Sequence, residues 1–160
     1  MDYRALYELL GEHTPLKFDC GRLCSAACCA EDEKTGGMYL FPGEAEVLGK
    51  VEGYTFSSMA LQGYGEVTLL KCAGKCDRAL RPLACRLFPL ALDLSGDEPG
   101  LITDPRGRAV CPLCHKDLEA LSVDFVQAVA QVYEKLLQEE ECARFLRALS
   151  REQEGYDHVL

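Results

Sequence analysis

The clearest periodicity in the sequence predicts two amphipathic helices near the carboxy-terminal end. Apolar residues recur there at intervals of three or four positions: Phe125, Val129, Val132, Leu136 and Leu137. A second set with helical spacing follows a run of glutamates: Cys142, Phe145, Leu146 and Leu149. Ser122 precedes the first set and is a suitable helix cap. We therefore expect a helical hairpin over about residues 117–150, followed by a mobile tail of the last ten residues.

Shorter elements are expected ahead of this hairpin. Apolar positions at helical spacing end at a glycine in the segment 3–11, which predicts a short amphipathic helix. Residues 38–41 read as a short buried strand that ends at Pro42, and a helical turn is expected within 44–51. We expect the first of these helices to cap the domain.

Two β-hairpins complete the expected secondary structure. The apolar runs 54–61 and 66–70 flank the turn Gly63-Tyr64-Gly65. A second pair of runs, 86–94 and 101–103, is separated by the turn-forming residues 95–100. The pattern predicts a small α+β protein.

Length and composition limit the classes of protein that fit. A chain of 160 residues with 48% hydrophobic and 27% charged residues has room for one folded domain, residues 1–160. Its net charge of −9 disfavours nucleic acid and anionic membrane surfaces as partners. No secretory signal precedes the first helix, and the longest uncharged stretch, 53–65, is too short to cross a bilayer. We expect a cytoplasmic protein.

Cysteine is the unusual residue type, with ten copies in the chain. Nine of them form three groups: Cys20, Cys24, Cys28 and Cys29, then Cys72, Cys76 and Cys85, and then Cys111 and Cys114. Cys142 stands apart on an apolar helix face and is expected to be a core residue. In a reducing compartment, clustered thiols bind metal or do redox chemistry more often than they form a disulfide framework.

The spacing within each group favours metal ligation. Cys20, Cys24 and Cys28 stand four residues apart, so on a continuous helix they would share one face. The alternative is a helix in which cysteines serve as apolar filler. The other pairs lie in turn-forming sequences: Cys72-Ala-Gly-Lys-Cys76 and Cys111-Pro-Leu-Cys114. A redox-active pair at Cys111 and Cys114 is a further alternative, without the strand–helix setting of a thioredoxin-like site.

Charge placement agrees with metal binding. Lysine and arginine are concentrated around the cysteine groups of this otherwise acidic chain. Nearby cations stabilise thiolates, which are the form of cysteine that binds metals. Arg81 and Arg86 flank Cys85, and we expect their guanidinium groups to donate hydrogen bonds to cysteine sulfur or to neighbouring carbonyls. Ordinary surface arginines are the alternative.

The segment Arg81-Pro-Leu-Ala-Cys85-Arg86-Leu-Phe-Pro89, taken with the Cys20–Cys29 group, resembles a known family. This is the zinc- or iron-chelating family named for its CxxCxxCC signature, which carries an Arg-Pro-x-x-Cys-Arg-x-x-Pro segment and a later Cys-Pro. The resemblance covers a signature core of residues 18–112. The spacing here is CxxxCxxxCC, one residue longer in each gap, and alanine stands where the signature usually has glycine.

By motif position the resemblance implies eight ligands: Cys20, Cys24, Cys28, Cys29, Cys72, Cys76, Cys85 and Cys111. Cys114 is an additional candidate, and its neighbour His115 is a possible substitute. Two Cys₄ zinc sites, one [4Fe–4S] cluster with a zinc, or three zinc ions with bridging thiolates would each use such a set. The sequence leaves these alternatives open.

Two functions follow from this interpretation. The first is a non-catalytic metal-binding protein in which zinc or an iron–sulfur cluster holds cysteine-rich loops and short hairpins together. Its carboxy-terminal helices would offer a surface to a protein partner. The second rests on the resemblance, because the family includes flagellin lysine N-methylase, and is an iron–sulfur methyl-transfer role. The sequence has no HExxH, P-loop or GxSxG motif, which favours the first function.

Overall fold

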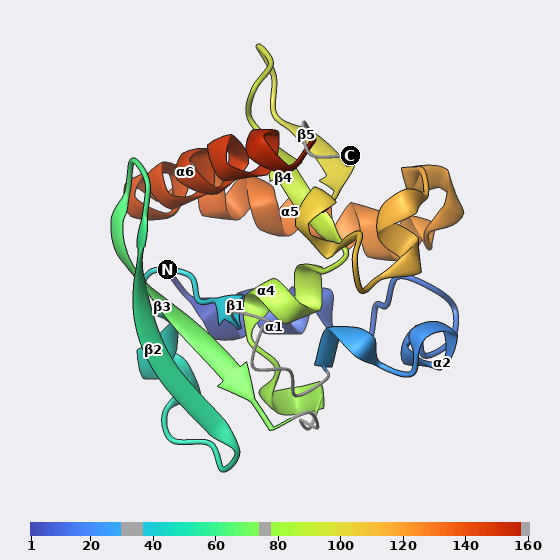
Figure 1. Ribbon diagram of the computed structural model, residues 1–160, viewed down its shortest axis with the longest axis horizontal. Coiled ribbons are helices and arrows are strands. Elements are labelled where there is room, and N and C mark those ends of the chain that lie inside the picture. Colours follow the sequence, from blue (N-terminus) through green and yellow to red (C-terminus); the bar gives the residue numbers. More distant parts are fainter. Residues whose placement is uncertain (30–36, 74–77, 158–160) are drawn as a thin grey trace.

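The computed structural model describes residues 1–29, 37–73 and 78–157 (Figure 1). The α-helices within this part of the chain are α1 (Tyr3–Leu10), α2 (Gly21–Cys24), α3 (Glu44–Leu48), α4 (Leu83–Leu87), α5 (Val123–Leu137) and α6 (Glu140–Asp157). The strands are β1 (Met38–Tyr39), β2 (Tyr54–Leu61), β3 (Gly65–Cys72), β4 (Leu90–Asp93) and β5 (Gly100–Thr103). Short 3₁₀ helices occur at Ala27–Cys29, Arg78–Leu80, Pro105–Gly107, Pro112–His115 and Leu118–Ala120. The expected α+β class is confirmed.

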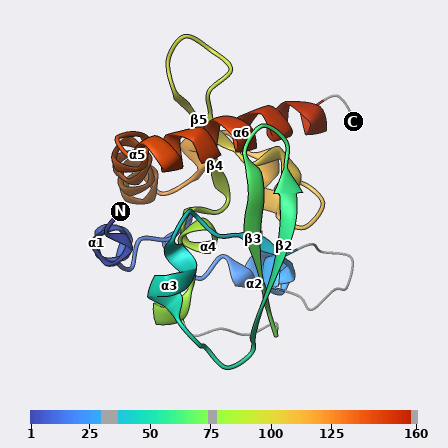
Figure 2. The same cartoon turned by 90° about the vertical axis from the view of Figure 1, so that its left-hand side faces the viewer.

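Both hairpins form antiparallel sheets. Strands β2 and β3 pair along their full length, from Tyr54 opposite Cys72 to Leu61 opposite Gly65, and β1 joins the other edge of β3. Strands β4 and β5 make a separate two-stranded sheet. The turn of the β2–β3 hairpin reaches α6 (Figure 2), where the Tyr64 ring meets the Phe145 ring at a centroid distance of 5.2 Å.

The predicted strand over 86–94 is partly wrong, because its first residues belong to α4. Pro82 is extended and precedes a helical turn that buries Leu83 and Leu87 together, four positions apart. Phe88 leaves the helix in an extended conformation ahead of Pro89, as the residue before a proline prefers. The strand therefore begins only at Leu90.

Helices α5 and α6 form the expected hairpin and supply much of the core. Phe125 and Phe145 are almost fully buried, and the Phe145 ring packs edge-on against Phe41 with 5.4 Å between centroids. The predicted mobile tail is wrong for residues 151–157, which continue α6. Ser150 and Gln153 are buried there, and the Ser150 hydroxyl accepts the Leu94 N–H, so contact with β4 orders the end of the helix.

Helix α1 is confirmed and packs against α5. The Asp2 carboxylate caps it, and the Tyr3 hydroxyl donates to the Pro42 carbonyl at 2.6 Å. Cys142 is 3% exposed, and its sulfur lies 3.7 Å from the same hydroxyl. The assignment of Cys142 to the core is therefore confirmed.

The expected continuous helix from Cys20 to Cys28 is wrong. Helix α2 ends at Cys24, because Ser25 and Ala26 adopt left-handed conformations with φ of 52° and 56°. The Ala26 N–H then bonds to the Gly21 carbonyl and closes the helix. Cys28 lies in the next 3₁₀ turn and does not share the helical face of Cys20 and Cys24.

Among the described residues, no helix combines the length and the apolar character that a bilayer crossing requires.

Candidate functional site

The first and third cysteine groups approach each other. Cys20 and Cys24 stand at the two ends of α2, and Cys111 and Cys114 belong to the turn around the 3₁₀ helix Pro112–His115. Burial raises the pKa of the Cys20 thiol, and negative charge on Asp19, Cys111 and Cys24 would raise it further. Cys20 is therefore in the electrostatic neighbourhood of both its own group and the distant Cys111.

Cys111 and Cys114 form the buried half of this arrangement. Their exposed fractions are 6% and 1%, and the two thiols are joined by a hydrogen bond. Burial raises the pKa of the Cys114 thiol, and Cys111 adds to the increase. The Cys114 thiol therefore stays protonated at neutral pH unless an added cation stabilises its thiolate.

Gly107 makes room for Cys114. A Cβ atom at this glycine would stand 2.7 Å from the Cys114 sulfur and equally close to the Phe88 ring. Such contacts are shorter than van der Waals packing allows, so only glycine fits without displacing one of these groups. The position of the Cys114 sulfur thus depends on a residue that the cysteine motifs do not include.

Arg81 and Arg86 have different surroundings. Arg81 lies near Cys20, where its charge opposes the increase in the thiol pKa. Arg86 donates from Nε to the Arg81 carbonyl at 2.7 Å and from a terminal nitrogen to the Ala79 carbonyl at 2.8 Å. Its guanidinium also lies 4.6 Å from the centre of the Tyr7 ring. These two hydrogen bonds of Arg86 go to neighbouring carbonyls, one of the two expected kinds of acceptor.

Sequence reasoning missed Glu44, which is 0% exposed. Its carboxylate accepts hydrogen bonds from the Leu83 N–H, the Phe41 N–H and the Tyr7 hydroxyl. Burial raises the pKa of this carboxyl, although these bonds and the charge of Arg86 act in the opposite direction. No local signal marks Glu44, because a glutamate in the first turn of a helix is common on protein surfaces.

The remaining candidates are more scattered. Cys72 ends β3 and is partly buried, Cys85 is partly buried on α4, and Cys28 is exposed. Cys76 and the Cys29 side chain lie outside the described part of the structure. The eight cysteines with described side chains carry thiols rather than disulfides: Cys20, Cys24, Cys28, Cys72, Cys85, Cys111, Cys114 and Cys142.

The described side chains do not form a closed ligand set. No group of three or more Cys, His, Asp or Glu residues within 1–29, 37–73 and 78–157 is arranged to hold one metal ion. His115 is exposed, and its Nε2 atom lies 2.9 Å from the Arg108 carbonyl oxygen. The interactions among the described thiols are pairwise: Cys20 interacts electrostatically with Cys24 and Cys111, and Cys111 interacts with Cys114.

Comparisons with family models, curated proteins and solved structures give no match. The roles of the residues must therefore be argued from their own chemistry and positions. On that basis, the region between α2 and the Cys111–Cys114 turn has the highest concentration of described thiols.

Proposed function

We propose that this chain is a metal-binding protein that holds zinc or an iron–sulfur cluster through cysteine thiolates. The observation that supports the proposal best is the electrostatic interaction between the thiols of Cys20, at the start of α2, and Cys111, in the turn ahead of α5. Cys24 interacts with Cys20, and Cys114 interacts with Cys111, so two further thiols adjoin this pair. Because the described thiols include no group of three or more arranged around one ion, these residues would supply part of a ligand set that the other candidate cysteines complete.

The chemistry of the donors fits such an ion. Thiolates are soft ligands that suit zinc and iron–sulfur clusters. The charge of Arg81 lowers the pKa of Cys20, and the charge of Arg108 lowers that of Cys114, so each end of the group has a cation to balance thiolate charge. Binding would replace the protons of buried thiols by a metal, and metal affinity should therefore increase with pH.

The role that follows is structural. An ion with four sulfur ligands has no open position for catalysis, but it would tie α2 to the segment that leads into the carboxy-terminal helices. The proposal agrees with the resemblance to the zinc- or iron-chelating CxxCxxCC family. We further propose that the metal-stabilised domain serves as an interaction module for a protein partner.

Elemental analysis of protein purified without oxygen tests the proposal. We expect stoichiometric zinc in colourless protein, or iron and acid-labile sulfide in brown protein. Brown protein would also support the methyl-transfer alternative, which needs an iron–sulfur cluster. Protein that carries neither metal, and takes up neither on reconstitution, would contradict the assignment.

Cysteine variants locate the ion. Cys20→Ser and Cys111→Ser should each abolish stoichiometric binding, since each removes one member of the central pair. Cys142→Ala is the matched control, because Cys142 is equally a thiol but contacts Tyr3 in the helical core. Metal retention in both serine variants would show that Cys20 and Cys111 are not ligands.

A further inference from the structure

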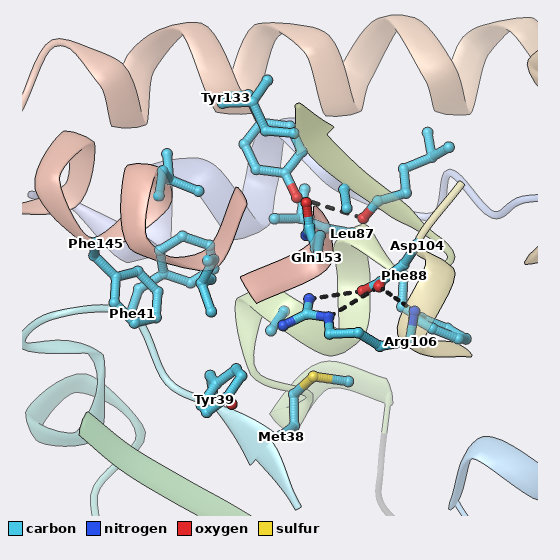
Figure 3. Close-up of a pocket in the computed structure, with 16 residues that line it drawn as sticks. Met38, Tyr39, Phe41, Leu87, Phe88, Asp104, Arg106, Tyr133, Phe145 and Gln153 are labelled. Carbon is cyan, nitrogen blue, oxygen red and sulfur yellow. Dashed lines mark hydrogen bonds and ion pairs between the residues drawn. The ribbon is translucent and has the colours of Figure 1, made fainter. Parts of the chain in front are cut away.

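A small cavity lies between α6, β4, β1 and the 3₁₀ helix Pro105–Gly107, away from the proposed metal ligands (Figure 3). Its volume is about 40 Å³. Five aromatic residues contribute to its wall: Tyr39, Phe41, Phe88, Tyr133 and Phe145. The wall is mainly apolar, and the Arg106 guanidinium already lies over the Tyr39 ring, 5.6 Å from its centre.

One polar group in the wall lacks a partner. Gln153 is 4% exposed, and its Oε1 atom has no hydrogen-bond partner among the described residues. The neighbouring Tyr133 hydroxyl is engaged, since it donates to the Leu90 carbonyl at 3.4 Å. A buried carbonyl oxygen without a donor is costly, so a donor placed in the cavity would gain a hydrogen bond to this atom.

The charged groups beside the cavity favour a positive occupant. Arg106 donates two hydrogen bonds to the Asp104 carboxylate, at 2.9 and 2.7 Å, and lies 3.5 Å from a Glu152 oxygen. The Tyr39 hydroxyl also donates to Glu152. Two carboxylates thus accompany one guanidinium, so the cluster carries a net negative charge that disfavours anions.

The volume limits the size of the occupant. One water molecule needs about 10–15 Å³ of cavity volume. A cavity of about 40 Å³ therefore has room for about three non-hydrogen atoms. Nucleotides, sugars and amino acids with large side chains are too big. Met38, Tyr39 and Phe88 are lining residues that are only partly buried.

We infer that this cavity binds a small primary alkylammonium ion. The ammonium group donates a hydrogen bond to Gln153 Oε1, and its charge is balanced by the excess carboxylate charge around Arg106. The alkyl carbons pack against the apolar wall. The inference does not depend on the proposed metal site, because none of its residues is a candidate metal ligand.

Methyl-¹³C methionine labelling offers a direct test with ethylammonium as the probe. Met38 lines the cavity, while Met1 and Met59 are exposed elsewhere. We expect a saturable shift of the Met38 methyl signal and none at the other two methionines. Ethanol has the same number of non-hydrogen atoms without the charge and should bind about tenfold more weakly or worse. An unresponsive Met38 signal, or an equal response to ethanol, would overturn the inference.

Gln153→Leu removes the unpartnered oxygen and gives two opposite effects. Ethylammonium affinity should fall about tenfold or more, while the midpoint of thermal unfolding in the absence of amine should rise. Gln131→Leu, on the exposed side of α5, should leave amine binding unchanged. A lower midpoint in Gln153→Leu would indicate that internal water already satisfies this oxygen and would overturn the inference. If the Gln153→Leu variant fails to fold, the ethylammonium titration of the natural protein, followed at the Met38 methyl signal, tests the inference by itself.

Discussion

The carboxylate of Glu44 caps the helix that begins at Leu83, accepting the Leu83 N–H at 2.5 Å. Pro82, at the cap position of α4, has no side-chain hydrogen bond to offer, so a residue from α3 takes this role. The same carboxylate holds Tyr7, whose ring lies under Arg86. One buried carboxyl group thus joins α1, α3 and the helix that carries Cys85.

Replacing Glu44 by Gln should destabilise the fold. The amide oxygen can keep some of the hydrogen bonds, but the amide nitrogen of glutamine is a donor and cannot serve the Phe41 N–H as the second carboxylate oxygen does. We expect a loss of about 1–3 kcal/mol in the free energy of unfolding, measured by urea denaturation. Glu46→Gln on the exposed side of the same helix should change it by less than about 0.5 kcal/mol. Equal effects would argue against the buried cap.

The raised pKa of Glu44 also predicts a pH dependence. At pH values between the ordinary pKa of glutamate and the raised pKa of Glu44 in the folded protein, Glu44 keeps its proton in the folded state. The unfolded chain has released this proton at the same pH. The contribution of Glu44 is therefore most favourable below its unfolded pKa and declines as the pH rises through this window, by at most about 1.4 kcal/mol per pH unit.

Unfolding curves of the natural protein and Glu44→Gln across this pH range isolate the effect. The stability difference between them should narrow with increasing pH, because only the natural protein has the titrating carboxyl. Tyr7 and Arg86 interact with the Glu44 carboxyl and are present in both proteins, so their own titration does not account for the difference. A difference that widens with pH would mean that the folded state lowers this pKa.

Two glycines should respond in opposite directions to alanine. Gly107→Ala brings a methyl group against the Cys114 sulfur and the Phe88 ring, so it should cost about 1–3 kcal/mol of stability. Gly155 is exposed on α6 with nothing within 4 Å of its added Cβ, so Gly155→Ala should gain about 0.5–1 kcal/mol. Thermal and urea unfolding of both variants test this. A neutral Gly107→Ala would mean that Cys114 and Phe88 can move apart freely.

Arg81 and Arg86 should affect metal retention by different routes. Arg81→Gln removes the cation beside Cys20, and Arg86→Gln cannot span the carbonyls of residues 79 and 81. We expect each to release bound metal to a chelator about tenfold faster than the natural protein. Arg147→Gln, exposed on α6, is the matched control. Release at the natural rate in both variants would make these arginines ordinary surface residues.

The sequence predicted elements whose signals are local. Helix α1, the β2–β3 hairpin and the pair α5 and α6 follow from apolar spacing, glycine stops and turn residues. The helix break after Cys24 was not predictable in this way, because Ser25 and Ala26 carry no turn signature comparable to glycine. The continuation of α6 to Asp157 depends on packing of Ser150 and Gln153 against distant elements.

The candidate site likewise combines features that are visible in the local sequence with features that depend on tertiary packing. The cysteines are recognisable as a group from their number and spacing, but their approach in space is a tertiary property. Glu44 and Gly107 act through residues far away in the sequence, so neither has a local pattern. The unpartnered oxygen of Gln153 is likewise visible only once the helix is packed.

Strand β2 has consequences for the handling of this protein. It forms an outer edge of its sheet, exposes Phe56 and Met59, and contains neither charge nor proline over Tyr54–Leu61. Natural sheets usually protect such edges with lysine, proline or a bulge. Aggregation of the concentrated protein should therefore begin by strand-to-strand pairing at this edge. Phe56→Lys should improve the solubility of the protein.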